Sequence, residues 1–247
     1  MKIIISPAKA MLSRTDTLPW CDLPLYLDKS QEILGTLKSM DYDALKQLWK
    51  CNDELAKLNF QRISRMELDR ELCPAIFAYD GIQYQNIDPD SFDDSDLEYI
   101  QENLRILSGF YGVLRPFDGV RPYRLEMQAK LQINDAKDLY SYWGDSIVKS
   151  ITENGECIVN LASKEYSRCV SKYLPNDYKF ITCIFGEEKD DKIIEKGTMC
   201  KIARGEMVHW MAKNKIDNLE ELRAFEGTYH RFSPEFSTDT ALAFIKK

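Results

Sequence analysis

The sequence has few of the residues and patterns that usually reveal an enzyme or a metal site. Its 247 residues include only two histidines, His209 and His230, and neither stands at H-x-x-H or C-x-x-C spacing from another ligand. The seven cysteines are scattered and odd in number, which favours free thiols in a reducing compartment. Glycine-rich nucleotide loops, a P-loop and a G-x-S-x-G element are absent. We therefore expect no metal and no cofactor, and the pattern identifies no catalytic residue.

Long apolar runs and an excess of positive charge are also missing. No stretch approaches the ~18 apolar residues of a membrane span, and the run Ile3–Ile5 is too short for a signal peptide. We expect a cytoplasmic protein with no membrane partner. Lys and Arg total 33 against 40 Asp and Glu, a net charge of −7, which argues against a surface that is basic all over. A local basic cleft remains compatible with this balance, because binding depends on where the charges lie.

Apolar patterning predicts one mixed α/β domain over residues 1–247, with a central mixed sheet and helical insertions. Residues 2–6 are a β-branched run without polar alternation, which predicts a strand buried on both faces. The same reasoning predicts strands over residues 157–163 and 179–185 and closing strands near the end of the chain. Helices are expected over residues 28–40, 41–50, 54–66, 138–155, 164–174, 204–216 and 218–225.

The stretch from Asp88 to Glu102 holds seven acidic side chains and no basic one. Ser95 and Glu98 match a capping box, so we expect a helix that begins there and continues to about Leu107. Acidic residues suit a solvent-facing helix N-terminus, which is a purely structural explanation of the cluster.

Three arginines mark the segment that follows this expected helix, residues 107–127. Arg115 and Arg121 each precede a proline, which favours extended backbone and restricts where their side chains point. Together with Arg124 they suit a fixed carboxylate or phosphate partner. The alternative is that Arg115 and Arg124 pair with Asp118, Glu126 or the acidic stretch, and the spacing leaves both possibilities open.

The beginning of the same segment has the pattern of a tight hairpin. Gly109 and Gly112 flank Phe110 and Tyr111, directly after the expected helix. Such a turn is similar to the hairpin of a helix-hairpin-helix element, whose backbone N–H groups approach nucleic-acid phosphates without reading bases. Pro116 limits this interpretation, because it prevents a long second helix from starting at the hairpin.

Two further groups of residues favour an anion site at strand ends. If a helix begins after the first strand, Ser6 is its N-cap and Lys9 lies in its first turn, an arrangement suited to phosphate. The alternative is a capped turn with a solvated lysine. Asn160 and Ser163 follow a second buried strand and precede basic residues. Further basic candidates are Lys164, Lys201 and Arg204, each of which fits a groove or a solvated helix face.

The ordered combination of "IISPAK", "LRILSGFYGVLRPFDGVRPYRLEM", "DLYSYWGD", "IVNLASKEY" and "KIARG" resembles the YaaA family of peroxide stress proteins along essentially the whole chain. The resemblance implies a cytosolic bacterial protein that limits unincorporated iron and so limits oxidative DNA damage. It also implies an unusual α/β fold that binds double-stranded DNA through a basic cleft with a helix-hairpin-helix element.

Carried over position by position, the resemblance assigns residues of this chain to two surfaces. The hairpin would use Ser108, Gly109, Tyr111, Gly112 and Arg115. The cleft would use Lys9, Arg124, Lys164, Lys201 and Arg204. The chain departs from the family pattern at Asp80, where a basic residue can occur.

Two functional hypotheses follow, and the sequence does not choose between them. In the first, the chain binds the backbone of double-stranded DNA without sequence preference. In the second, it is an enzyme for a small phosphorylated or nucleotide-like substrate, with a pocket formed by Ser6, Lys9, Arg124, Asn160, Ser163 and Lys201. Direct iron sequestration by the acidic stretch is poorly supported, because no compact set of His and carboxylate ligands is visible.

Overall fold

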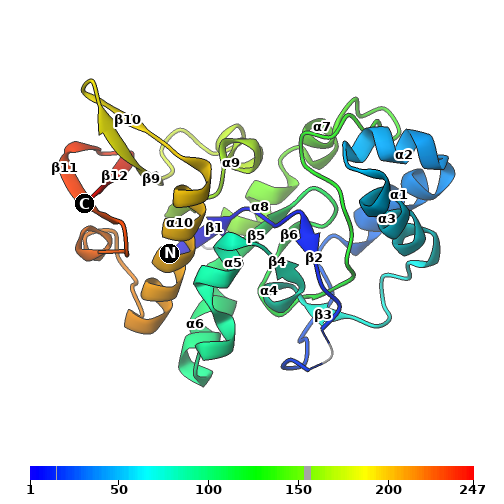
Figure 1. Cartoon of the computed structure of the whole chain (residues 1–247), viewed down its shortest axis with the longest axis horizontal. Helices are drawn as coiled ribbons and strands as arrows, with labels where there is room; N and C mark the ends of the chain where they lie inside the picture. Colours follow the sequence, from blue (N-terminus) through cyan, green and yellow to red (C-terminus); the bar gives the residue numbers. More distant parts are fainter. Residues whose placement is uncertain (15, 153–156) are drawn as a thin grey trace.

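The computed structural model describes residues 1–14, 16–152 and 157–247, and it confirms the expected mixed α/β fold. In the described residues, eight strands form a central sheet in the order β11-β12-β9-β8-β1-β5-β6, with β10 paired to β9 (Figure 1). Five neighbouring strands are parallel: β12 (Ala241–Lys246), β9 (Phe180–Lys189), β8 (Ile158–Leu161), β1 (Lys2–Ile5) and β5 (Leu104–Ser108). The antiparallel strands are β11 (His230–Thr238), β6 (Gly112–Leu114) and β10 (Lys192–Ile194).

Strand β1 lies in the middle of this sheet and is buried on both faces, as its sequence predicts. Ile3, Ile4 and Ile5 are all 0 % exposed. Ile5 pairs with Ile106 of β5 on one side and with Leu161 of β8 on the other. After β1, the next parallel strand in the chain is β5, which lies on one side of β1 in the sheet. The following parallel strands, β8 and β9, lie on the opposite side of β1, so the direction in which strands are added reverses there. Reversals of this kind open a crevice at the carboxyl ends of parallel strands, where α/β proteins bind ligands.

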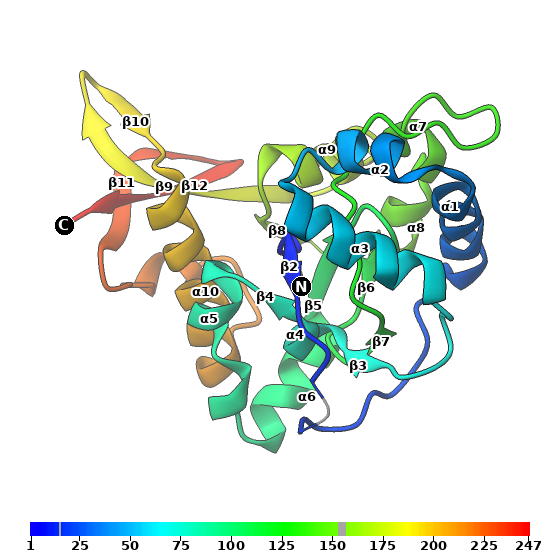
Figure 2. The same ribbon diagram turned by 45° about the vertical axis from the view of Figure 1, so that its right-hand side comes forward.

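Helices α1 (Leu27–Ser39), α2 (Tyr42–Trp49) and α3 (Asp53–Arg65) lie together at one end of the molecule, opposite β9–β12 (Figures 1 and 2). Asp41 caps α2 by accepting a hydrogen bond from Ala44 N, as expected. Asp28 is not a cap, because α1 already begins one residue before it.

Seven further helices are present in the described residues. They are α4 (Ala75–Ala78), α5 (Ile82–Ile87), α6 (Asp94–Asn103), α7 (Leu139–Trp143), α8 (Ser146–Thr152), α9 (Lys164–Ser171) and α10 (Gly197–Asn214), with short 3₁₀ turns η1 (Pro89–Ser91) and η2 (Glu221–Ala224). Two small ribbons pair β2 (Ala10–Met11) with β4 (Tyr79–Asp80) and β3 (Cys73–Pro74) with β7 (Gly119–Val120). None of the helices in the described part of the chain combines the length and apolarity needed to cross a membrane.

Helix α10 approaches α5 closely because it has glycine at the contact. A Cβ added to Gly205 would lie 2.3 Å from the carbonyl oxygen of Gln83 and 2.7 Å from Cβ of Asn86. Only a residue without a side chain permits this separation. The close approach brings the first half of α10 against α5, beside the carboxyl end of β1.

Two expected helices are shorter than their patterns predict. The helix expected over residues 138–155 is divided into α7 and α8 by Gly144, whose φ of +53° ends the first of them. Its last part, residues 153–156, lies outside the described residues. The helix expected over residues 218–225 is only the short turn η2.

The helix in the acidic stretch differs from the prediction at both ends. Asp93, not Ser95, is its N-cap, and Asp96 completes the capping box. The helix ends at Asn103 rather than near Leu107. Residues 104–108 form β5 instead, because pairing with β1 and complete burial of Ile106 override their helical spacing.

The expected helix-hairpin-helix element is wrong: β5 and β6 form a buried β-hairpin, in which Ser108 pairs with Gly112. The hydroxyl of Ser108 accepts hydrogen bonds from the backbone N–H groups of Phe110 and Tyr111. Both aromatic side chains are 0 % exposed, so the turn faces the core rather than a nucleic acid. The amides of Phe110 and Tyr111 are therefore satisfied within the turn and are not available to phosphate.

Gly112 is required by both its backbone conformation and its surroundings. Its φ is +75°, a left-handed conformation that residues with a side chain rarely adopt. An added Cβ would also lie 2.7 Å from the indole ring of Trp143. Trp143 is itself fixed, because its Nε1 donates a hydrogen bond to the carbonyl oxygen of Gly109.

Replacing Gly112 with alanine should therefore lower the free energy of unfolding by about 2 kcal/mol or more, through backbone strain and the clash with Trp143. The matched control is Gly35→Ala in α1, where nothing lies within 4 Å of an added Cβ. This control should be neutral or raise stability by roughly 0.5–1 kcal/mol. Urea unfolding measures both variants, and equal effects would contradict the assignment.

Candidate functional site

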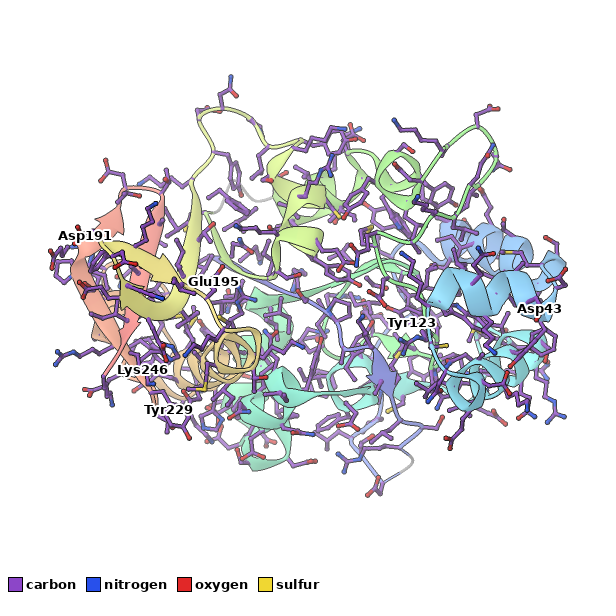
Figure 3. All side chains as sticks on the ribbon, turned by 45° about the horizontal axis from the view of Figure 1, so that its top comes forward. Asp43, Tyr123, Asp191, Glu195, Tyr229 and Lys246 are labelled. Atoms are coloured by element: carbon purple, nitrogen blue, oxygen red, sulfur yellow. The ribbon has the colours of Figure 1, made fainter. Side chains whose placement is uncertain are left out.

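A cavity of about 420 Å³ lies at the carboxyl ends of β1 and β8, where the sheet reverses its order of connection. Its walls come from the segment after β1, from α5, from residues 123–126, from the start of α9 and from α10. Figure 3 shows Tyr123, a wall residue, between α10 and the α1–α3 end and closer to the latter. We call this cavity the switch-point pocket.

A pair of serines joins the two strand ends at the pocket. Ser6 Oγ donates a hydrogen bond to Ser163 Oγ at 3.2 Å and accepts one from Ser163 N at 2.9 Å. Tyr84 supports them from α5, because its hydroxyl donates to the carbonyl oxygen of Ser6 at 3.0 Å. Two residues placed at strand ends by the sequence analysis are thus in direct contact, 157 positions apart.

A helix after the first strand, considered as one possibility from the sequence, is not formed. The hydroxyl that would cap it is held by Ser163, and residues 10–11 continue as β2, which pairs with β4. Lys9 nevertheless reaches the pocket, where its ammonium pairs with Glu126 at 2.9 Å. Its side chain remains 64 % exposed, so it lies at the mouth rather than deep inside.

The three arginines of residues 107–127 have different environments. Arg115 pairs with Asp118 and Asp22, and Arg121 pairs with Glu71. The alternative interpretation, pairing with acidic side chains of the chain, is therefore confirmed for Arg115 and Asp118, whereas the pairing of Arg121 with Glu71 was not expected. Arg124 lines the switch-point pocket and has no ion-pair partner among the described residues; its Nε is buried without a hydrogen-bond acceptor.

Helix α10 contributes two further cations to the pocket wall. Lys201 is exposed and makes no ion pair with any residue that the structure describes. Arg204 is only 14 % exposed in its side chain and contacts Glu195 at 3.3 Å. Its Nε, like that of Arg124, is buried without an acceptor. The pocket therefore keeps positive charge that the described part of the chain does not neutralise.

Asn160, an expected pocket residue, and Lys164, a candidate for the basic cleft, both lie outside the switch-point pocket. Asn160 does not line the cavity; its side chain accepts a hydrogen bond from Ala162 N and donates one to Thr182 Oγ1, which fixes the end of β8. Lys164 follows Ser163 on the exposed side of α9 and is not part of the wall. Ser108, Gly109, Tyr111 and Gly112 are buried in the hairpin.

Sequence reasoning noted Asp80 as a departure from the family pattern, but it did not predict the acidic part of the pocket wall. Asp80, Glu126 and Glu165 line the pocket beside the cations. Burial and, in smaller measure, the charge of Glu126 raise the pKa of Glu165 above its usual value, although the hydrogen bond from the backbone N–H of Gln128 opposes the shift. Gln83 is also buried in the wall, with its Nε2 lacking an acceptor. Glu165 could have been found from its place directly after the second strand, in "NLASKEY".

Tyrosines form the apolar side of the pocket. The hydroxyl of Tyr123 lies 2.6 Å from Ser108 Oγ and 2.8 Å from the hydroxyl of Tyr79. Burial raises the pKa of Tyr123 to about 12, so its hydroxyl stays protonated at physiological pH. Ser108, predicted as a DNA contact, thus holds a pocket tyrosine from behind.

The acidic stretch has structural partners instead of the geometry of a metal centre. Asp96 is 2 % exposed and pairs with Lys213 and Lys215 of the α10 region. This contact holds the pKa of Asp96 well below its usual value despite burial. Across residues 1–14, 16–152 and 157–247, no three His, Cys, Asp or Glu side chains are grouped as metal ligands.

Comparison with known proteins places the chain in a family. The family model described as "Peroxide stress protein YaaA" matches residues 1–236. The chain belongs to the YaaA family. It is 49 % identical to a UPF0246 protein of Lachnoclostridium phytofermentans over 246 residues, which covers 100 % of this chain and 96 % of that protein. It is also 49 % identical to a UPF0246 protein of Ligilactobacillus salivarius over 246 residues, with 100 % of both chains covered.

For this YaaA chain the family name supports a role in peroxide stress, which agrees with the resemblance seen in the sequence. The relative from Desulfitobacterium hafniense, 47 % identical over 246 residues, covers 100 % of this chain as well. The family assignment therefore applies to the whole arrangement of sheet and pocket, not to one fragment.

A pH test addresses Asp118, the buried partner of Arg115. Burial raises the pKa of Asp118 to about 6, although its bonds to Arg115 oppose the shift. The folded state then takes up a proton between pH 7 and pH 5 that the unfolded state does not, so stability should rise as pH falls. The expected gain from this group is about 1 kcal/mol. Urea unfolding of wild type and Asp118→Asn at both pH values measures it; an unchanged difference between the two proteins would contradict the shift.

Proposed function

We propose that this YaaA-family chain acts in the cytoplasmic response to peroxide by binding a small phosphorylated or nucleotide-like ligand in the switch-point pocket. The observation that carries the proposal is Arg124, which lines the cavity and has no ion-pair partner among the described residues. The other two arginines of its segment are both paired with carboxylates. An unpaired guanidinium in a concave site is suited to a phosphate, which it can hold with two parallel hydrogen bonds.

The surroundings of Arg124 support the same ligand. The pocket lies outside the carboxyl ends of parallel strands at a reversal of strand order, the usual ligand position in open α/β sheets. Lys201 adds a second unpaired cation, and the Ser6–Ser163 pair adds hydroxyl groups. In an enzyme, the same cations would stabilise negative charge developing on a transferred or departing group.

Arg124→Gln tests this proposal, because it keeps a polar side chain and removes the guanidinium with its charge. We expect binding of inorganic phosphate and of nucleoside monophosphates, measured by calorimetry at low salt, to weaken at least about tenfold, the equivalent of ~1.4 kcal/mol. The control is Arg223→Gln, an exposed arginine that pairs with Glu220 away from the pocket. Equal binding by both variants, or no binding of any probe by wild type, would refute the proposal.

A second candidate function is binding of double-stranded DNA without sequence preference. It is favoured by three exposed lysines, Lys9 and Lys201 in the pocket wall and Lys164 beside it at the start of α9. The three lysines come from separate segments that line or border the pocket. In this hypothesis, the phosphate backbone of DNA lies over the mouth of the pocket and contacts them. Asp93 and Asp96 of the acidic stretch already have structural partners, so this stretch is a poor candidate for binding iron. We propose that any limitation of iron-dependent damage depends instead on the bound ligand or DNA.

Lys164→Gln separates the DNA hypothesis from the pocket hypothesis, since this lysine does not line the cavity. If DNA binds here, affinity should fall with salt, and the variant should reduce the slope of log K against log salt by about 0.9 for one lost phosphate contact. Lys57→Gln in α3 is the control, because Lys57 is exposed and pairs with Asp53 far from the pocket. A duplex titration that shows no binding at low salt would exclude this candidate.

A further inference from the structure

We propose that Glu126 and Glu165 form a hydroxyl-recognising edge of the switch-point pocket, so that its ligand is a nucleotide or another sugar phosphate rather than phosphate alone. This inference rests on the phosphate-binding function proposed above and names the class of ligand more narrowly. The basis of the inference is the presence of carboxylates in the pocket wall, because a site that binds only a simple anion does not need them.

Carboxylates are mixed with cations in the pocket wall. Lys9, Arg124, Lys201 and Arg204 stand beside Asp80, Glu126 and Glu165. A carboxylate repels a phosphate, so a pocket selected for phosphate alone would be expected to exclude it. An ionised carboxylate only accepts hydrogen bonds, and its oxygens offer about four acceptor positions, so those that the chain leaves free suit a donor such as a hydroxyl on the ligand. A ligand with a phosphate at one end and hydroxyls at the other satisfies both kinds of side chain.

Glu126 and Glu165 lie close enough to influence each other, and their positions are fixed. Glu126 pairs with Lys9 at 2.9 Å, which holds its carboxylate at the mouth. Glu165 Oε1 accepts a hydrogen bond from Gln128 N at 3.2 Å, which orients the group from the neighbouring segment. In the part of the chain that the structure describes, no lysine or arginine forms an ion pair with Glu165. Burial and the charge of Glu126 raise the pKa of Glu165. Hydrogen bonds donated by a ligand would stabilise the ionised form of Glu165 and so oppose this shift.

The size and lining of the pocket also exceed what one phosphate requires. The cavity of about 420 Å³ lies in the range of roughly 300–1,000 Å³ that is typical of small-molecule sites. Tyr84, Tyr123 and Tyr166 are buried and line it, so an apolar surface is available for the ring of a sugar or a base. Acidic residues near a strand end bind ribose hydroxyls in other α/β folds by the same chemistry.

Calorimetry with three probes in EDTA-containing buffer tests the inference. The probes are inorganic phosphate, ribose 5-phosphate and tetrahydrofurfuryl phosphate, which keeps the ring and the phosphate but lacks the ring hydroxyls. We expect wild type to bind ribose 5-phosphate at least about tenfold more tightly than tetrahydrofurfuryl phosphate. Glu165→Gln should remove most of this preference without weakening the binding of inorganic phosphate, because the variant loses a carboxylate that repels the anion. Glu188→Gln, an exposed position on β9, is the control and should retain the preference.

The outcomes separate the two proposals. Equal binding of the two sugar probes by wild type, with phosphate still bound, overturns this inference alone. A preference that appears only when Mg²⁺ replaces EDTA also overturns it, because the carboxylates would then act through a metal. Failure of every probe to bind overturns the proposed function itself. If Glu165→Gln does not fold, Glu126→Gln supplies the same comparison, and thermal unfolding of each variant checks the fold.

Discussion

The pairing of β1 between β5 and β8 is the constraint on which the rest of the structure depends. A strand of three consecutive isoleucines, all 0 % exposed, can be satisfied only in the middle of a sheet that is covered on both faces. Its parallel partners then bring residues 6 and 163 to one edge, where Ser6 and Ser163 are hydrogen-bonded. The position of the pocket is therefore a consequence of burying β1, and a polar residue inside β1 would disturb the fold and the pocket together.

The hairpin after β5 has a supporting role in the same arrangement. Ser108 bonds the turn amides and the hydroxyl of Tyr123, and Gly109 accepts a hydrogen bond from Trp143. These contacts hold the segment that carries Arg124 and Glu126 against the sheet. Arginine–proline pairs and glycines in this segment thus serve mainly to fix a backbone path, and only one of the three arginines is left to face a ligand.

The amino-acid sequence was sufficient to predict those features that depend on local pattern. The buried strand at residues 2–5, the cap at Asp41 and the strand ending before Ser163 follow from apolar runs and capping chemistry. The end of α6 could not be predicted in this way, because residues 104–108 become a strand only through pairing with β1. Most of the candidate site was also predicted from the sequence: the pocket is lined by Ser6, Lys9, Arg124, Ser163 and Lys201, but not by Asn160. Which arginine stays unpaired depends on Asp22 and Glu71, which are distant in sequence.

A crystal structure of the chain grown with a saturating nucleoside monophosphate tests the central claim most directly. The account predicts the phosphate in the switch-point pocket, within hydrogen-bond distance of the Arg124 guanidinium and beside the Ser6–Ser163 pair. Ligand bound elsewhere on the surface, with Arg124 making no contact to it, would contradict the account.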